Sequence, residues 1–201
     1  DRYYARACFV LLAHTGLRIG ELRQVRWRDL TTIKGKDEQG EATEYLVVNV
    51  AKGKTGAREA VFQPGFEVIV KRLYLHRKKE LESQSPSQIE ILPDRDEPIL
   101  CHPDGRPIRE YKHAFKSLLA FAKIPADRDG KARTIYSLRH YYATQRLTEE
   151  TNPFLLAHQM GTSVEMLEQH YGQVISRELA AQITRRKPSR LAVKTDTEFP
   201  F

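Results

Sequence analysis

Four residues in this sequence have side chains that can cut a phosphodiester bond without a metal ion. Tyr171 carries a phenol that can attack phosphorus and form a covalent phosphoryl-enzyme. The guanidinium groups of Arg18 and Arg139 can bind the non-bridging oxygens and stabilise the charge of the transition state. Lys54 can give a proton to the departing oxygen. The pattern indicates phosphoryl transfer to a tyrosine, provided that folding brings the four residues together.

Hydrophobic periodicity predicts the helices and strands that must bring these four residues together. The expected fold class is mainly α (α+β), with one small antiparallel sheet. The apolar spacing predicts helices over 3–13, 19–25, 64–81, 109–123, 137–148, 153–160, 163–170 and 178–185. Strand-like stretches cover 27–33, 45–50 and 58–62, with loops at 35–43 and 52–56. Arg18 then lies at the start of the second helix, Lys54 at a hairpin tip and Tyr171 at the end of the seventh helix.

Length and composition favour one domain, over residues 1–186, with a tail at 187–201. The formal net charge of +7 favours a polyanionic partner, above all nucleic acid, although such an excess can also serve solubility alone. Cys8 and Cys101 lack metal-type spacing, which favours a reduced, cytosolic setting. No metal site is expected, and no apolar run is long enough to span a membrane.

Four segments in order resemble the catalytic domain of the tyrosine recombinases, the phage-integrase family. They are T-G-L-R-I-G-E-L at 15–22, K-T-G at 54–56, Y-S-L-R-H at 136–140 and H-Y-G at 170–172. The resemblance covers about residues 13–172, most of the chain. It implies the tyrosine-recombinase catalytic fold, with a three-stranded antiparallel sheet that bears the hairpin lysine.

The resemblance also implies a role for each matching residue. Glu21 matches the acidic residue that braces the first arginine, and Lys54 is preferred over Lys52 as the hairpin lysine. Lys52 and Arg58 are then expected to bind DNA. His140 is either a structural residue or an assistant in phosphate binding or nucleophile activation. The implied catalytic set is Arg18, Lys54, Arg139, His140 and Tyr171.

Two positions depart from the family pattern. Tyr136 stands where the family commonly has histidine or lysine, and Thr162 stands where it commonly has histidine or tryptophan. The Tyr136 hydroxyl can still donate a hydrogen bond to phosphate. Thr162 begins a T-x-x-E capping box, so it is either a helix cap or a phosphate ligand. His158, one helical turn earlier, is a third candidate assistant, whereas Tyr142 is a rival nucleophile that we expect to pack in the core.

The function implied by the resemblance is site-specific DNA recombination or integration through a 3′-phosphotyrosyl intermediate, without metal or cofactor. The implied partners are double-stranded DNA attachment sites and, for a longer parent protein, a homotetramer on DNA that exchanges residues 176–186 between subunits. This fragment alone is expected to be a monomer, and its upstream DNA-clamping domain to be missing. A bacterial or phage cytoplasm and a mobile element are the expected setting.

Two other functions remain open at this stage. An enzyme like the type IB topoisomerases would share the chemistry but relax any supercoiled DNA. A binding-only descendant would hold DNA without covalent capture, and the departures at Tyr136 and Thr162 are the sequence features that favour it. An RNA-binding module is disfavoured, because nothing resembles a pair of base-stacking aromatics or a G-x-x-G clamp.

Overall fold

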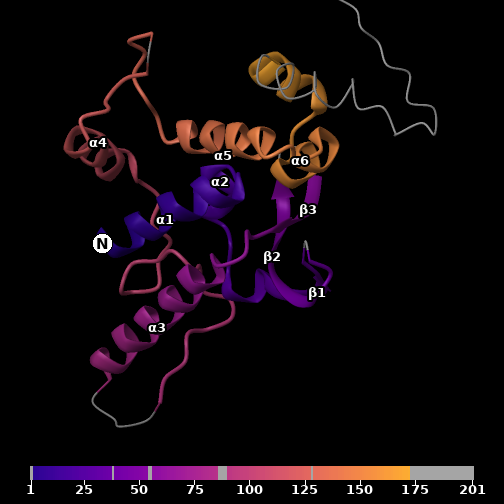
Figure 1. Cartoon of the computed structure of the whole chain (residues 1–201). Coiled ribbons are helices and arrows are strands. Elements are labelled where there is room, and N and C mark those ends of the chain that lie inside the picture. The colour runs from indigo at the N-terminus through magenta and orange to yellow at the C-terminus, as the bar shows by residue number, and fades with distance from the viewer. Residues whose placement is uncertain (1, 38, 54–55, 86–89, 128, 173–201) are drawn as a thin grey trace, which may run out of the picture.

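The computed structural model describes residues 2–37, 39–53, 56–85, 90–127 and 129–172. Helix α1 (Arg2–Thr15) is central to this fold, since α3, α4 and α5 all pack against it. Its buried face includes Tyr4, Cys8, Leu11 and Leu12. Figure 1 shows α5 crossing one side of α1 and α3 lying on the other. The buried helix predicted from the apolar run at 3–13 is confirmed, with one more turn in total.

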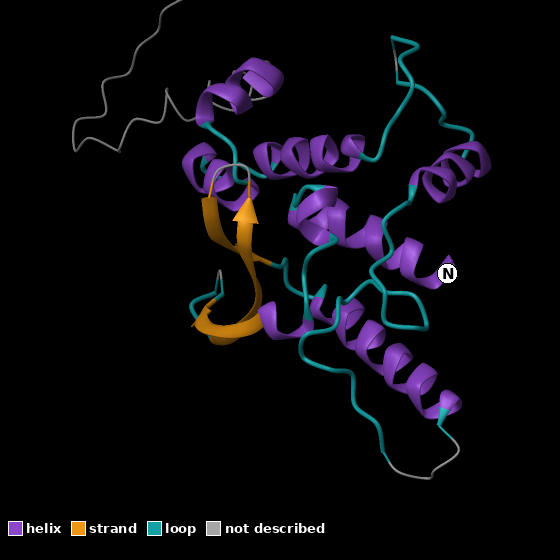
Figure 2. Cartoon of the chain, turned by 180° about the vertical axis from the view of Figure 1, so that it is seen from behind, coloured by secondary structure: helices purple, strands orange, loops and turns teal. Residues whose placement is uncertain are grey.

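The sheet has three antiparallel strands in the order β1-β2-β3, coloured orange in Figure 2. They are β1 (Leu30–Lys36), β2 (Ala42–Gly53) and β3 (Gly56–Val61). A 3-10 turn, η1 (Trp27–Asp29), occupies the start of the first predicted strand. The loop predicted at 35–43 is shorter in the structure, because Gly35 pairs with Thr43 and Lys36 with Ala42.

A tight turn joins α1 to the short helix α2 (Ile19–Leu22), which ends earlier than predicted. Gly16 in this turn has a φ of +66°, and a Cβ there would lie 2.4 Å from the ring of Tyr142 on α5. Only glycine fits both the left-handed backbone and this close approach. The turn therefore carries α2 directly beneath α5. Helices α3 (Glu67–Gln84) and α4 (Lys112–Phe121) follow the sheet.

The last part of the described chain is helical, as predicted: α5 (Tyr136–Thr148), α6 (Pro153–Met160) and residues 164–172. Gly161 ends α6 with a φ of +63°, and the N–H of Thr162 donates to the Ala157 carbonyl at 2.9 Å. The next helix is capped by Ser163, whose Oγ accepts the Met166 N–H at 3.2 Å. The cap is therefore Ser163 and not Thr162, whose N–H closes the end of α6 instead.

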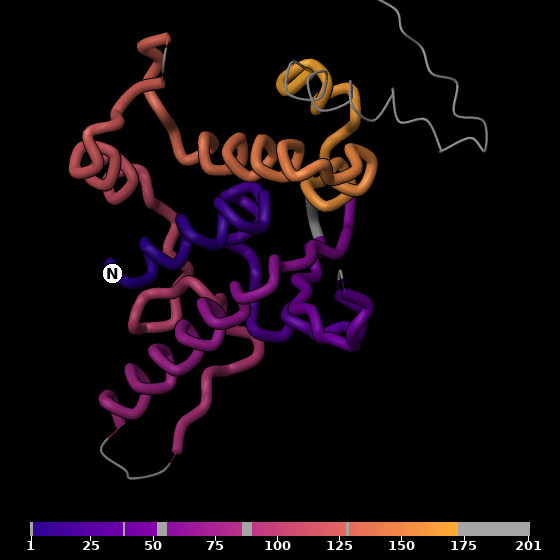
Figure 3. The backbone as a smooth tube through the Cα atoms, viewed as in Figure 1, coloured from indigo at the N-terminus to yellow at the C-terminus, as the bar shows by residue number. Residues whose placement is uncertain are grey.

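The buried side chains form two hydrophobic clusters. The first cluster runs from Tyr4 to Leu119 and joins α1, α3, α4 and the sheet. The second cluster runs from Tyr142 to Leu167, with Tyr171 packed at its edge. Tyr142 is 5% exposed, so the prediction that it packs in the core is confirmed. Figure 3 shows the indigo α1 beside the orange α5, and the two helices contact each other.

Within the described ranges, no helix is both long and apolar enough to cross a bilayer. The helix predicted at 178–185, the tail and the exchanged segment 176–186 lie outside the described residues.

Candidate active site

The side chains of His140 and Tyr171 meet at the edge of the second cluster. His140 lies in the second turn of α5, and Tyr171 lies near the end of the described helical residues 164–172. Nδ1 of His140 and the phenolic oxygen of Tyr171 are hydrogen-bonded. When the imidazole is neutral and protonated at Nε2, Nδ1 is free to accept the phenol proton. This pair has the geometry of a nucleophile and its base.

The electrostatic surroundings set the protonation state of the pair. Burial raises the pKa of Tyr171 to about 12, and a nearby Tyr136 adds to the rise while Arg139 opposes it. Burial also lowers the pKa of His140, helped by the charges of His170, Arg139 and Lys131. At neutral pH the phenol is therefore protonated and the imidazole uncharged. The phenol must lose its proton to act as a nucleophile, and His140 is in position to receive it.

Arg139 joins this pair to the turn before α2. Its side chain is buried, and Nη1 donates to the carbonyl of Gly16, which is 123 residues away in sequence. Burial and the charge of Arg18 lower the pKa of Arg139 below its ordinary value. The two arginines predicted to act together are therefore close in space. Arg18 lies just before α2, and Arg139 lies in the first turn of α5.

Arg18 is fixed by contacts on both sides. Its Nη1 donates to Glu21 Oε1 at 3.0 Å, and its Nη2 donates to the Gly161 carbonyl at 2.7 Å. Its backbone N–H donates to Glu21 Oε2 at 2.9 Å. The side chain remains 24% exposed. Glu21 therefore contacts Arg18 in the manner that the family resemblance implied, and Arg18 ties α2 to the end of α6.

Arg58 on β3 is buried, with a side chain only 4% exposed. Its Nη1 and Nη2 donate to the two oxygens of Glu21 at 3.1 and 2.9 Å. Nε and Nη2 also donate to the carbonyls of Gln159 and Met160, both at 3.2 Å. The prediction that Arg58 binds DNA does not agree with this burial. Arg58 and Ala60 are two residues apart in β3, so they lie on the same face of the strand. Ala60 is buried, and this spacing was the sequence signal that the Arg58 side chain points inward.

Glu21 therefore bridges two arginines, and both arginines also hold the carboxyl end of α6. Burial raises the pKa of this carboxyl group, but hydrogen bonds from Arg58 and Arg18 outweigh it and keep the pKa below 4.5. Positive groups at the last carbonyls of a helix also interact favourably with its dipole. A Cβ at Gly161 would lie 2.6 Å from the Arg58 guanidinium, so glycine is needed there as well.

The remaining predicted residues lie in different places. Tyr136 begins α5, is 51% exposed, and its ring lies edge-on to His140 with centroids 4.9 Å apart. Thr162 is partly buried, and His158 is exposed in the last turn of α6. Lys54 and the side chain of Lys52 lie outside the described residues; the strands that flank them end at the paired Gly53 and Gly56. The described residues therefore bring together Arg18, Glu21, Arg139, His140, Tyr171 and Tyr136.

No protein-family model matches the sequence, and no curated protein is similar to it in sequence. Solved structures do match. XerA recombinase has a TM-score of 0.60 at 18% identity, covering 92% of this chain and 58% of that one. XerH site-specific recombinase, bound to its difH substrate after cleavage, has a TM-score of 0.59 at 16% identity, covering 90% of this chain and 45% of that one. The Tn1549 transposon integrase with transposon end DNA has a TM-score of 0.56 at 20% identity, covering 88% and 58%.

The fold is therefore that of the tyrosine recombinase catalytic domain, and the resemblance seen in the four motifs is confirmed at the level of the fold. The chain spans about half the length of these structures.

Proposed function

We propose that this chain is the catalytic domain of a tyrosine site-specific recombinase or integrase, which cuts and rejoins DNA through a 3′-phosphotyrosyl intermediate. The observation that carries the proposal is the hydrogen bond between Tyr171 and His140 beside the buried Arg139. A phenol that shares its proton with a neutral imidazole and lies next to fixed guanidinium groups suits attack on a phosphodiester. The solved structures of the same fold are recombinases and an integrase.

The reaction exchanges one phosphate ester for another. The Tyr171 oxygen attacks the scissile phosphorus while its proton passes to Nδ1 of His140. The bond from phosphorus to the 5′ oxygen breaks, and the 5′ oxygen takes a proton from Lys54 and leaves as a hydroxyl. A 5′ hydroxyl from a second strand then attacks the phosphotyrosine and gives its proton to Lys54, while His140 returns the first proton to the leaving oxygen of Tyr171. Because the covalent link conserves the phosphodiester bond energy, the cycle needs no nucleotide cofactor.

The arginines supply the positive charge that this reaction needs. Arg18 binds a non-bridging oxygen, because its exposed edge gives the phosphate access to it. Arg139 is buried beside Arg18 and adds its positive charge to the site. Glu21 keeps the Arg18 guanidinium in place without reaching the substrate itself. Removal of a single donor of this kind typically slows catalysis about 10²- to 10³-fold.

The proposal includes the partners of the reaction. The substrate is a double-stranded DNA attachment site, and the full-length parent works as a homotetramer in which residues 176–186 pass to a neighbouring subunit. The setting is a bacterial or phage mobile element in the cytoplasm. The formal charge of +7 supports a DNA partner.

Covalent trapping tests the proposal. The chain, and a longer parent that contains it, are incubated in EDTA with nicked suicide duplexes that carry the candidate attachment site. A denaturant-resistant adduct should form with the wild type and disappear in Tyr171→Phe. Tyr142→Phe is the matched control, because it removes a phenol oxygen from a buried ring of the same cluster.

Three outcomes would reject parts of the proposal. An adduct that persists in Tyr171→Phe and disappears in Tyr142→Phe would move the nucleophile to Tyr142. A parent that binds the site tightly but forms no adduct would be a binding-only protein. Equal reaction with any supercoiled DNA would identify a relaxing enzyme of the topoisomerase type.

A further inference from the structure

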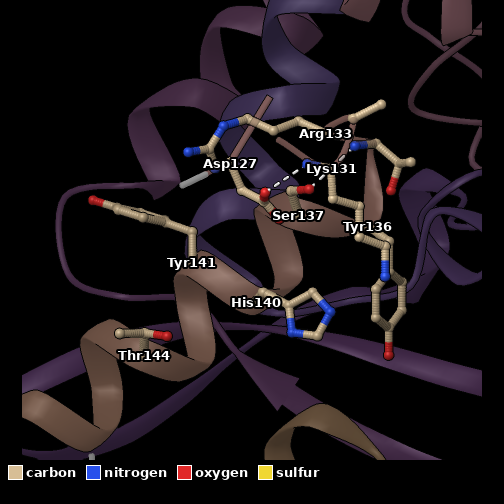
Figure 4. A pocket seen from close by; sticks show the side chains of 10 residues that line it. Asp127, Lys131, Arg133, Tyr136, Ser137, His140, Tyr141 and Thr144 are labelled. Carbon is tan, nitrogen blue, oxygen red and sulfur yellow. Dashed lines mark hydrogen bonds between the residues drawn. The ribbon is translucent and has the colours of Figure 1, made fainter. Parts of the chain in front are cut away.

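A hollow of about 800 Å³ lies along one face of α5, beside the candidate active site (Figure 4). We call it the α5 groove. The helix contributes residues that share one face, and the segment before the helix contributes the other wall. The lining includes Lys131, Arg133, Tyr136, Ser137, His140 and Tyr141. His140 belongs both to this lining and to the pair with Tyr171, so the groove borders the side chain that contacts the proposed nucleophile.

The cationic wall of the groove is held in a defined shape. Ala126 and Ala132 form a β-bridge, and Asp127 Oδ1 accepts the backbone N–H of Lys131 at 2.8 Å. The Nε of Arg133 donates to the Ala126 carbonyl at 3.0 Å. The carboxylate of Asp127 thus binds the backbone of its own turn, while the side chains of Lys131 and Arg133 are exposed beside the hollow.

The opposite wall carries the exposed rings of Tyr136 and Tyr141 and the hydroxyl groups of Ser137 and Thr144. Tyr136 is 51% exposed and Tyr141 is 48% exposed, although both belong to a well-formed helix. The ring of Tyr141 is supported from behind by His14, with centroids 6.4 Å apart in an edge-on arrangement. Ser137 joins the two walls, because its Oγ accepts the Thr134 N–H at 3.1 Å. The groove therefore combines exposed rings with fixed positive charge.

This combination is the one by which proteins hold unpaired nucleic acid. Aromatic rings stack on bases of any sequence, and neighbouring cations bind the backbone phosphates. The volume is that of a small-molecule site, so it suits a nucleotide and is too small for a duplex. The shared His140 adds a reason for such a ligand, since strand cleavage at Tyr171 would leave one DNA end without its covalent link.

We propose that the α5 groove binds an unstacked nucleotide of the DNA strand next to the cleaved phosphate. The base lies against the ring of Tyr141, and its phosphate lies on Lys131 and Arg133. The groove thereby keeps the strand with the free 5′ hydroxyl close to the phosphotyrosine until strands are rejoined. This inference rests on the proposed function, because it takes DNA as the ligand and Tyr171 as the point of cleavage.

Binding of a short fluorescent oligothymidylate and of a blunt duplex, each followed by anisotropy, tests the groove. Tyr141→Ala and the double variant Lys131→Ala/Arg133→Ala should each weaken binding of the oligothymidylate about 5- to 100-fold. Duplex binding should change much less in Tyr141→Ala. Phe121→Ala, an aromatic ring 87% exposed on α4, and Lys79→Ala, an exposed lysine on α3, are matched controls that should leave both affinities unchanged.

A second variant reports on stacking itself. The chain has one tryptophan, Trp27, so Tyr141→Trp adds a single new fluorophore to the groove. Its emission should be quenched by the oligothymidylate, and the wild type should show no comparable change. A groove without this ligand would give no quenching, or equal losses of single-strand and duplex binding in all the variants, including the controls.

The experiment separates this inference from the proposed function. Tyr171→Phe should bind the oligothymidylate as the wild type does, because it keeps the ring and the groove. If the wild type forms the Tyr171 adduct but the groove variants bind normally, the groove assignment alone is wrong. If Tyr141 is needed for single-strand binding and no adduct forms on any site, the groove assignment stands and the recombinase assignment is wrong.

Discussion

At the scale of single residues, His140 and Tyr171 determine when the proposed reaction can start. Tyr171 is protonated at rest, with a pKa raised to about 12 by burial, so attack requires proton transfer. His140 can accept this proton only while it is uncharged. Burial and the nearby positive groups lower its pKa, so the uncharged form persists below the ordinary histidine range near pH 6.5.

A pH profile of single-turnover cleavage checks this role. The rate should be constant near neutrality and fall about tenfold per pH unit once the pH drops below the lowered pKa of His140, which lies under about 6.5. His140→Gln should slow cleavage about 10²- to 10⁴-fold and remove this acid limb. His76→Gln on α3 is the control, and its pH profile should keep the acid limb. An acid limb that survives in His140→Gln would mean that another group accepts the proton.

At the scale of elements, the carboxyl end of α6 connects the sheet, α2 and the helix of Tyr171. Arg18 holds the Gly161 carbonyl, and Arg58 holds those of Gln159 and Met160. Both arginines share Glu21, so the three charged groups form one buried network. The network positions the end of α6, and only two residues separate Gly161 from the helix that carries Tyr171.

Arg58→Met tests how much this network contributes to the fold. Removing one partner of a buried ion pair should lower the free energy of unfolding by about 3–5 kcal/mol, because Glu21 is left buried with less compensation. The double variant Glu21→Gln/Arg58→Met should cost less than the two single changes added together, as urea denaturation can measure. Arg106→Met, in an exposed pair with Asp104, should change stability little. If Arg58→Met and Arg106→Met changed the free energy of unfolding equally, the network would not stabilise the fold.

The elements themselves could largely be predicted from the sequence, because alternation and helical spacing are local. The sequence could also have predicted that the Arg58 side chain points inward, because Arg58 shares a face of the strand with the apolar Ala60. Its partner could not, since Glu21 is 37 residues away. The family resemblance did put His140 and Tyr171 in one catalytic set, but their hydrogen bond, across 31 residues, comes from the structure. The sequence left Thr162 as either a helix cap or a phosphate ligand, and the structure gives the cap to Ser163 instead, because both residue types can cap a helix. The choice depends on the left-handed Gly161, whose turn uses the Thr162 N–H to close α6.

At the scale of the whole molecule, the positive charge and the site lead to a prediction about DNA affinity. If the chain contacts about six phosphates, its affinity should fall about 10³-fold between 50 and 200 mM salt, because counterions are released from the DNA. Tyr171→Phe should show the same salt dependence, since it removes no charge. A titration of duplex binding against salt measures both slopes. A flat response would mean that the charge of +7 does not serve DNA binding.

The division of the core into two clusters has a consequence for the growing polypeptide. All residues of the first cluster lie at or before Leu119, whereas the second cluster is built from residues 142–167 and carries Tyr171 at its edge. During synthesis the first cluster can pack while the proposed nucleophile and its base are still inside the ribosome. The proposed site would then be complete only after the second cluster has been made, since Arg18 itself is held by the carbonyl of Gly161.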